Sequence, residues 1–445
     1  MAARLPGPLQ LADLGRAVGR HFDEPLLRDD GFVDWSRFFD WLGRRSDRFL
    51  LVLDEFPYLV EADPAVPSLW QRGWDQALAR TRACVVLMGS SVSMMERETL
   101  AERSPLYGRR TGQLRLQPFG FRDAARFLPR FSFEDQVRAY SMLGGIPYYL
   151  TRFDDARPLA HNLRTALLEP GAVLRDEVEF LLREELQEPR VYFAVMQAIA
   201  QGKRRSSEIA NAVALPYSSL GKYLGVLQSL DLVRREVPVT EAVPEKSKRG
   251  LYAIVDPYVA FWFRHVFSRR SLLEVGRTAE AAAEISAELD LWASAAYEEI
   301  CRQEVRRGLL DDPAGVRWAA VGRWWEPGHE LDLVAYDAGR GCLLVAECKW
   351  SRRPVGLDVL AQLERAAEPL CRSFPGARVL RALFSRAGFT ADLVRRAAGD
   401  PDLVLVRGLS LSPGAAARPP GAGPSEARER PVPYGARPRR RRRSA

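Results

Sequence analysis

The segment RFLLVLDEFPYL, which contains Asp54 and Glu55, constrains the fold of this chain more than any other. It is a short, continuous apolar run that ends in two adjacent acids. Such a run is typical of a central strand in a parallel sheet, because both faces of that strand are buried. The sequence therefore predicts an α/β unit with two carboxylates at the carboxyl end of a central strand. The alternative is that the acids only begin a turn before Pro57.

Two more strand-like segments follow the acid pair. After a helix-like stretch over residues 70–80, the run ACVVLMGSS predicts a neighbouring strand that ends in Ser90 and Ser91. The segment SPLYGRRTGQLRLQPF then places Arg109 and Arg110 before a predicted third strand, QLRLQPF. A helical segment, FEDQVRAYSMLGGIPYYL, comes next. As a set, these segments are more specific than the acid pair alone.

These motifs resemble the archaeal-type AAA+ P-loop ATPases, also found in bacteria, in which an ATPase module precedes a winged helix and a nuclease-like C-terminal domain. The resemblance extends from about residue 14 to about residue 408, and LVLDEFPYL, GSSVSMMERE, SPLYGRRTGQ and GGIPYYL carry it. It implies an α/β multidomain fold in five parts: a partial P-loop AAA+ ATPase core (1–130), a helical lid (131–188), a winged helix (189–268), a PD-(D/E)xK nuclease-like domain (269–410) and a tail (411–445).

The resemblance also implies ATP and Mg²⁺ as cofactors. In that arrangement Asp54 holds Mg²⁺ through water, and Glu55 activates the attacking water. A serine of the pair at 90–91 senses the γ-phosphate or positions water, and an arginine of the pair at 109–110 stabilises charge on the transferred phosphoryl group. Exposed arginines that flank a strand are also common. Because AAA+ relatives often form oligomers, a homo-oligomer is a further expectation.

The phosphate-binding loop of that family is absent from the sequence. Family members carry G-x-x-x-x-G-K-[ST], whose backbone amides and lysine bind the phosphates, upstream of the acid strand. Neither Gly-Lys pair here, at 202–203 and 221–222, is followed by Ser or Thr. About fifty residues precede the acid strand, fewer than the loop with its own strand and helix needs. This suggests an N-terminally truncated relative or a late start, and predicts weak ATP binding or none.

The charge of the chain is concentrated at its C-terminus. The formal net charge is +8, and nine Arg and two Glu between Pro413 and Ala445 supply +7 of it. That tail is too rich in Pro, Gly and Arg to bury a core, so we expect it to be disordered. No apolar run approaches the ~18 residues of a membrane span, and the N-terminus lacks the apolar core of a signal peptide. We therefore expect a cytoplasmic protein that does not bind membranes.

Residues 190–255 are basic even without the tail, with ten Lys or Arg against five Asp or Glu. KRRSSEIANAV predicts a helix, and YSSLGKYLGVLQSLDLV a second one with leucines at helical spacing on one face. Two strands joined by a basic loop follow. This order is typical of a winged helix that contacts DNA, with the second helix in the major groove. The alternative is a packing module between domains. The candidate DNA contacts are Ser218, Ser219, Lys222, Lys246, Lys248 and Arg249.

A second set of chemical groups lies near the C-terminus. AYEEICRQEV predicts a helix with Glu298, WWEPGHELDLVAYD a strand with Asp332, and GCLLVAECKW a strand with Glu347 and Lys349. Side chains at i and i+2 of a strand share a face, so the last two emerge together. The spacing resembles the PD-(D/E)xK nuclease fold, which implies that the three acids bind Mg²⁺ and that the lysine stands near the attacking water. The alternative is a cross-strand salt bridge.

Two functional hypotheses remain. The first is an enzyme, an AAA+ ATPase coupled to DNA binding and to a Mg²⁺-dependent nuclease-like domain, with impaired ATP binding. The second is a non-catalytic DNA-binding or regulatory protein in which neither site turns over.

Overall fold

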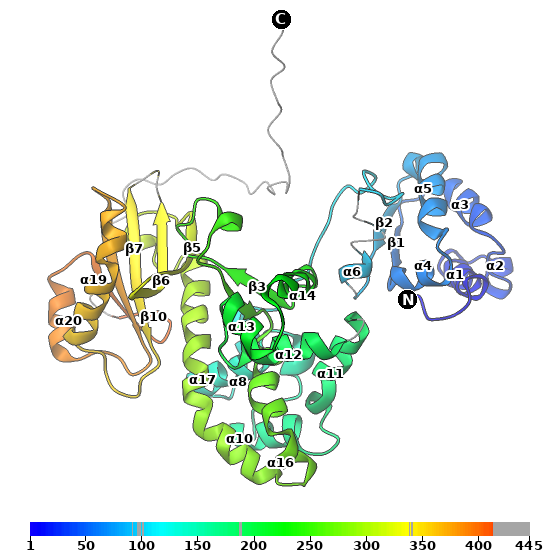
Figure 1. Ribbon diagram of the computed structural model, residues 1–445. Coiled ribbons are helices and arrows are strands. Elements are labelled where there is room, and N and C mark those ends of the chain that lie inside the picture. Colours follow the sequence, from blue (N-terminus) through cyan, green and yellow to red (C-terminus); the bar gives the residue numbers. More distant parts are fainter. Residues whose placement is uncertain are drawn as a thin grey trace, which may run out of the picture.

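The computed structural model describes residues 1–412 apart from 91, 96–98, 100–101, 187–188, 338 and 340. Ser91 therefore lies outside the described residues, as does nearly all of the tail expected at 411–445. Along the chain, an N-terminal α/β unit is followed by a helical middle part and then by a C-terminal unit built on a sheet (Figure 1).

The N-terminal unit packs helices against two parallel strands. β1 (Leu50–Leu53) pairs with β2 (Cys84–Leu87), which confirms both predicted strands. The expected burial of both strand faces is wrong, because Leu53 is buried but Leu50 on the other face is 63% exposed. The unit has its own apolar core. Its other elements are α1 (Gly7–Phe22), α2 (Pro25–Asp29), α3 (Trp35–Gly43), α4 (Phe56–Ala62), α5 (Val66–Gln76), η1 (Leu78–Arg80) and α6 (Val92–Met95).

The predicted third strand, QLRLQPF, is wrong. Residues 111–120 form no strand, and Leu114 and Leu116 are 84% and 83% exposed. The alternating pattern that suggested a strand lies instead in the extended connection between the N-terminal unit and the rest (Figure 1). This connection ends where the Phe119 amide donates to the Gly145 carbonyl oxygen at 2.9 Å.

The middle of the chain is helical, as predicted for the lid. Its elements are α7 (Phe121–Ala125), α8 (Phe133–Leu143), α9 (Pro147–Leu150), α10 (Leu159–Leu163), η3 (Arg164–Leu168) and α11 (Val173–Glu185). Phe121, Ala124 and Leu128 belong to this core, although they precede the expected domain boundary at residue 130.

Three helices and a hairpin come next. They are α12 (Pro189–Ala200), α13 (Ser206–Ala212), α14 (Tyr217–Ser229), β3 (Val233–Glu236), η4 (Pro244–Lys246) and β4 (Leu251–Ile254). β3 and β4 pair in antiparallel fashion, and α14 buries Leu220, Leu224 and Leu227, which confirms the predicted helical spacing. A short aromatic-rich stretch then packs into the core, as predicted. It comprises α15 (Pro257–Phe261), η5 (Trp262–Val266), η6 (Phe267–Arg269) and α16 (Arg270–Glu274).

The C-terminal unit is a sheet covered on both faces. Its strands are β5 (Ala320–Glu326), β6 (His329–Asp337), β7 (Cys342–Lys349), β8 (Arg378–Ser385), β9 (Leu403–Arg407) and β10 (Ser410–Leu411), in the spatial order β10-β9-β8-β7-β6-β5. β5, β6 and β7 are antiparallel, whereas β7, β8 and β9 are parallel. Its helices are α17 (Thr278–Arg306), α18 (Asp311–Ala314), α19 (Leu357–Arg372) and α20 (Ala391–Ala398).

α17 covers one face of this sheet, and α19 and α20 cover the other. Ala346 and Cys348 of β7 share a core with Ile300 of α17, while Val345 packs with Leu363 of α19. The segment WWEPGHELDLVAYD is not one strand as predicted but a hairpin. Its turn contains Gly328, whose φ of 84° lies in the left-handed region that glycine favours. In the described part of the chain, no helix has the length and hydropathy to cross a bilayer.

Candidate functional site

Asp332, Glu347 and Lys349 meet where β6 begins and β7 ends. Leu333 and Ala346 form the last pair of the antiparallel register, and Asp332 and Glu347 are the residues directly beyond it on the two strands. The Cys348 amide donates to Asp332 Oδ2 at 2.9 Å, which fixes that carboxylate against β7. Lys349 Nζ lies 2.5 Å from Glu347 Oε1, so these two side chains emerge together as predicted.

Glu298 approaches the same place from α17. Its side chain is mostly buried, and among the described residues its ionic contact is with Arg302, at 3.8 Å from Arg302 NH1 to Glu298 Oε2. No hydrogen bond to the Glu298 carboxylate is found among the described residues. The neighbouring Glu299 differs, because it pairs with Arg302 Nε and with Arg306 NH1, each at 2.8 Å. One helical turn therefore carries one neutralised carboxylate and one that lacks a close partner.

The pKa values place Asp332 near each of the other two acids, because its charge raises the pKa of both Glu298 and Glu347. Burial raises the pKa of Glu298 to about 7, and the negative charge of Asp332 adds to this effect. Burial also raises the pKa of Asp332. The pKa of Glu347 is raised first by burial and then by the charge of Asp332. For Lys349, burial lowers the pKa, but the pair with Glu347 outweighs it and the pKa is raised.

The side-chain types at this site suit a hard divalent cation, but the side chains are not arranged as a complete set of ligands. Carboxylate oxygens are the ligands that Mg²⁺ prefers, and the Glu298 carboxylate has no close partner to give up. A nearby cation stabilises the charged form of buried carboxylates whose pKa is raised, as it is for Glu298, Asp332 and Glu347. Within the described residues, however, no three His, Cys, Asp or Glu side chains already stand close enough to hold one metal ion.

Arg302 and Arg323 are parts of this site that the sequence analysis missed. Arg302 NH1 donates to the main-chain oxygen of Asp332 at 2.6 Å. Arg323 on β5 lies 3.6 Å from Glu236 of β3, and its charge lowers the pKa of Glu298 as a minor contribution. The i+4 spacing from Glu298 to Arg302 was a usable signal for the first. Nothing local in the sequence marks the second, because its partners come from other elements.

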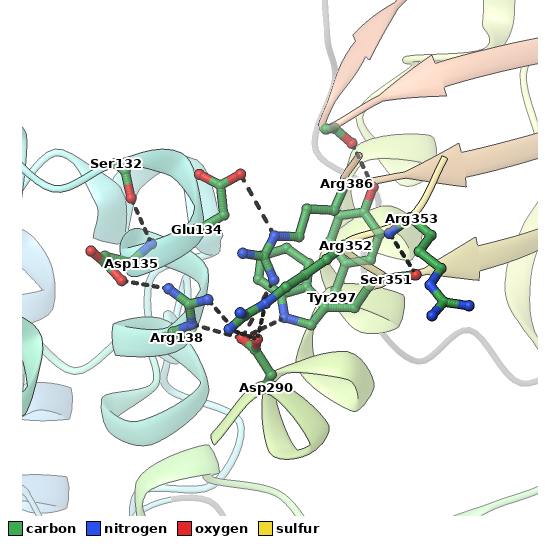
Figure 2. Close-up of polar contacts among 12 residues, drawn as sticks. Ser132, Glu134, Asp135, Arg138, Asp290, Tyr297, Ser351, Arg352, Arg353 and Arg386 are labelled. Atoms are coloured by element: carbon green, nitrogen blue, oxygen red, sulfur yellow. Dashed lines mark hydrogen bonds and ion pairs between the residues drawn. The ribbon is translucent and has the colours of Figure 1, made fainter. Parts of the chain in front are cut away.

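Residues that directly follow Lys349 belong to an ionic cluster around Asp290. Figure 2 shows Arg138 of α8 and Arg352 and Arg386 of the C-terminal unit directed at the Asp290 carboxylate of α17. The shortest distances are 2.7, 2.9 and 3.4 Å, respectively. Trp350 Nε1 is 3.4 Å from the same carboxylate. Burial alone would raise the pKa of Asp290, but the arginines outweigh it and lower the pKa to about 2.

In the N-terminal unit, the ends of β1 and β2 come together as predicted. The Ser90 amide donates to Glu55 Oε2 at 3.4 Å, and the Phe56 amide to the Met88 carbonyl oxygen at 2.9 Å. Asp54 follows the last residue of β1, and Glu55 precedes α4 with a φ of 55°. A left-handed φ is costly for a residue with a side chain and is often found at functional sites.

The two predicted arginines are placed differently from each other. Arg109 donates to both carboxylate oxygens of Asp75, at 2.9 and 2.7 Å, and to the Pro105 carbonyl oxygen. The guanidinium of Arg109 is therefore committed to the C-terminal end of α5. Arg110 is exposed, and its guanidinium lies 6.0 Å from the centre of the Tyr107 ring.

The exposed face of α14 carries three of the predicted DNA contacts. Ser218, Ser219 and Lys222 are exposed, and a side chain at Gly221 or Gly225 would meet nothing within 4 Å. The face is therefore open and free of bulky side chains along its middle. Small residues of this kind let a helix approach another surface closely.

Two of the loop residues are exposed, but the third is not free. Lys246 and Lys248 are exposed between β3 and β4. Arg249 pairs with Glu241, donates to the Trp325 carbonyl oxygen at 3.1 Å, and accepts from Trp325 Nε1 through its own carbonyl oxygen at 3.2 Å. Arg249 thus holds the β3–β4 loop against β5, where the Val239 amide also donates to the Arg323 carbonyl oxygen at 2.9 Å.

Comparison with known proteins gives two family matches and two relatives. Residues 11–153 match a family described as an ATPase domain predominantly from Archaea, and residues 262–362 match one described as "Archaea bacterial proteins of unknown function". An uncharacterized protein of Methanocaldococcus jannaschii is 34% identical over 317 residues, which cover 71% of this chain and 70% of that protein. A second uncharacterized protein of that organism is 36% identical over 64 residues, which cover 14% of this chain and 60% of that protein.

Proposed function

This chain belongs to the archaeal ATPase-like family of the Methanocaldococcus jannaschii protein to which it is 34% identical, and from that premise we propose that its C-terminal unit hydrolyses phosphodiester bonds of DNA with a divalent metal ion. The observation that carries the proposal is the convergence of Glu298, Asp332 and Glu347 with Lys349 at one end of β6 and β7. Their raised pKa values argue for a cation among them, because carboxylates that only pair with surface cations have lowered pKa values.

The chain's own residues supply complementary roles. A bound Mg²⁺ would polarise the phosphodiester and lower the pKa of an attacking water. Asp332 and Glu347 would bind the ion from the sheet, and Glu298 from the helix. Lys349 keeps its proton at neutral pH, since the pair with Glu347 raises its pKa. It therefore acts as a cation that orients water and stabilises the charged phosphate, and it does not act as a base.

The helices and hairpin over residues 189–254 are proposed to be a winged helix that holds the DNA. The open face of α14, with Ser218, Ser219 and Lys222, supports contact with a groove of the duplex. Lys246 and Lys248 support contact with phosphates, which position DNA without reading its sequence. The contact of the β3–β4 loop with β5 connects this proposed DNA-binding unit to the sheet that bears the acids.

At the other end of the chain, membership of the family implies use of a nucleotide and Mg²⁺. Asp54 and Glu55 are the groups that would face the metal and the attacking water. Because the sequence contains no amide cradle with its lysine, we propose that this polypeptide binds MgATP weakly. A titration that gives micromolar affinity for MgATP contradicts this part of the proposal.

A second candidate function is a non-catalytic DNA-binding or regulatory protein. The pair of Glu347 with Lys349 at 2.5 Å and the lack of a ready three-ligand group among the described residues favour it. In that case the acids and basic residues of the C-terminal unit serve as a structural salt-bridge network.

Incubation of supercoiled plasmid with the full chain and Mg²⁺ or Mn²⁺ separates the two. The enzyme proposal predicts nicked plasmid with the wild type and none with Lys349→Ala. Lys248→Ala is the matched control, because it removes a lysine charge from the β3–β4 loop and leaves the acid site intact. It should weaken DNA binding in a salt-dependent way while the bound complex still nicks. No metal-dependent nicking on duplex or single-stranded substrates refutes the enzyme proposal.

A further inference from the structure

Arg302 is a buried cation in the middle of the acid site. It is 5% exposed and lies on α17 one turn after Glu298. A buried guanidinium is costly unless most of its donors are used. Its Nε donates to Glu299 Oε2 at 2.8 Å, and its NH1 donates to the main-chain oxygen of Asp332 at 2.6 Å. The same NH1 lies 3.8 Å from Glu298 Oε2.

Neutralising Glu299 does not explain this placement. Arg306, on the same helix and 44% exposed, already pairs with Glu299 Oε1 at 2.8 Å. What distinguishes Arg302 is its bond to the backbone of β6 at Asp332. One guanidinium therefore joins the helix that bears Glu298 to the strand residue that bears the Asp332 carboxylate. A planar guanidinium with fixed donor directions holds such a geometry better than the flexible ammonium of lysine.

We propose that Arg302 is a positioning residue for the metal site: it fixes Glu298 relative to Asp332, so that both carboxylates reach one divalent cation. This inference rests on the proposed function of the C-terminal unit. Arg302 does not touch the ion. Groups that orient metal ligands in this way typically change metal affinity by about 10- to 100-fold when they are replaced.

The test is a calorimetric titration of the full chain with Mn²⁺, comparing the wild type with Arg302→Lys and Arg306→Lys. Arg302→Lys keeps the charge but loses the forked contact, and we expect its Mn²⁺ affinity to fall at least about tenfold. Arg306→Lys is the matched control, since it changes the other partner of Glu299 and does not touch Asp332. Its affinity should stay within about twofold of the wild type, a difference of no more than ~0.4 kcal/mol.

Equal affinities of Arg302→Lys and the wild type would overturn the positioning role and leave the proposed function standing. A wild type that binds no Mn²⁺ overturns both. If the circular dichroism spectrum shows that Arg302→Lys does not fold, the double variant Arg302→Gln, Glu299→Gln is titrated in its place. Removing both members of a buried pair is far better tolerated than removing one. The double variant carries the same expectation of at least a tenfold loss, and wild-type affinity in it overturns the role of Arg302.

Discussion

Replacing Glu298 with Gln should make the protein more stable at alkaline pH. The pKa of the Glu298 carboxyl is about 7 in the folded chain, against an ordinary value of 4.5. The folded state therefore holds a proton that the unfolded state has released between these two pH values. By linkage, stability falls as pH rises from 4.5 to about 7 and is constant above that. Glu298→Gln removes this titration and keeps the shape of the side chain.

The magnitude follows from the pKa difference. Each unit of pKa between the folded and unfolded states corresponds to ~1.4 kcal/mol, so the rise from 4.5 to about 7 corresponds to ~3.5 kcal/mol at most. Part of this rise comes from the charge of Asp332, and the Glu298 side chain is 21% exposed, so we expect a gain of about 2 kcal/mol for Glu298→Gln at pH 8. At pH 5 the two proteins should have nearly equal free energies of unfolding.

Urea denaturation at pH 5 and pH 8, without metal, measures this difference. Glu299→Gln is the matched control on the adjacent residue. Burial raises the pKa of Glu299, but Arg302 and Arg306 outweigh it and lower the pKa, so this substitution should destabilise the protein at pH 8. Mn²⁺ should stabilise the wild type more than Glu298→Gln. If Glu298→Gln is destabilising at pH 8, the carboxylate is satisfied in the fold and the reasoning fails.

Three other changes test the rest of the fold. Asp290→Asn should cost about 1–2 kcal/mol at pH 7, because the lowered pKa reflects three arginines and solvent screens a carboxylate that is 30% exposed; urea denaturation measures it. Gly145→Ala should lower the melting temperature by several degrees, since its Cβ would lie 1.9 Å from the Phe119 carbonyl oxygen. Burial lowers the pKa of His265 to about 3, so stability should fall as pH drops from 6.5 toward 3, and His265→Phe should flatten that slope.

Sequence reasoning worked where the signal was local. The apolar runs predicted the strands β1, β2 and β7, and the leucine spacing of α14 predicted its buried face, because strand and helix periods differ. The burial of β1 and β2 was overestimated, since Leu50 and Val86 are exposed. The pairing of Glu347 with Lys349 followed from the two-residue period of a strand. The third strand failed because alternation shows that a segment can form a strand, not that a partner strand lies beside it. Leu114 and Leu116 lie instead in an exposed connection.

Contacts between elements that are distant in the sequence could not be predicted from local patterns. Arg249 has the composition of a phosphate-binding residue, but Glu241 and the backbone of Trp325 engage it in the fold. Arg109 likewise pairs with Asp75, thirty-four positions earlier in the chain. For charged residues in loops, partner choice depends on which elements pack together, and no local periodicity encodes that. The cluster around Asp290 combines four separate segments for the same reason (Figure 2).

The central claim is that Glu298, Asp332 and Glu347 bind one divalent metal ion beside Lys349. Anomalous diffraction from a crystal grown with saturating Mn²⁺ tests it most directly. The account predicts an anomalous peak bound by carboxylate oxygens of Asp332 and Glu347, with Glu298 drawn toward it directly or through water. Saturating Mn²⁺ with no peak at this position, and with Lys349 still paired to Glu347, would contradict it.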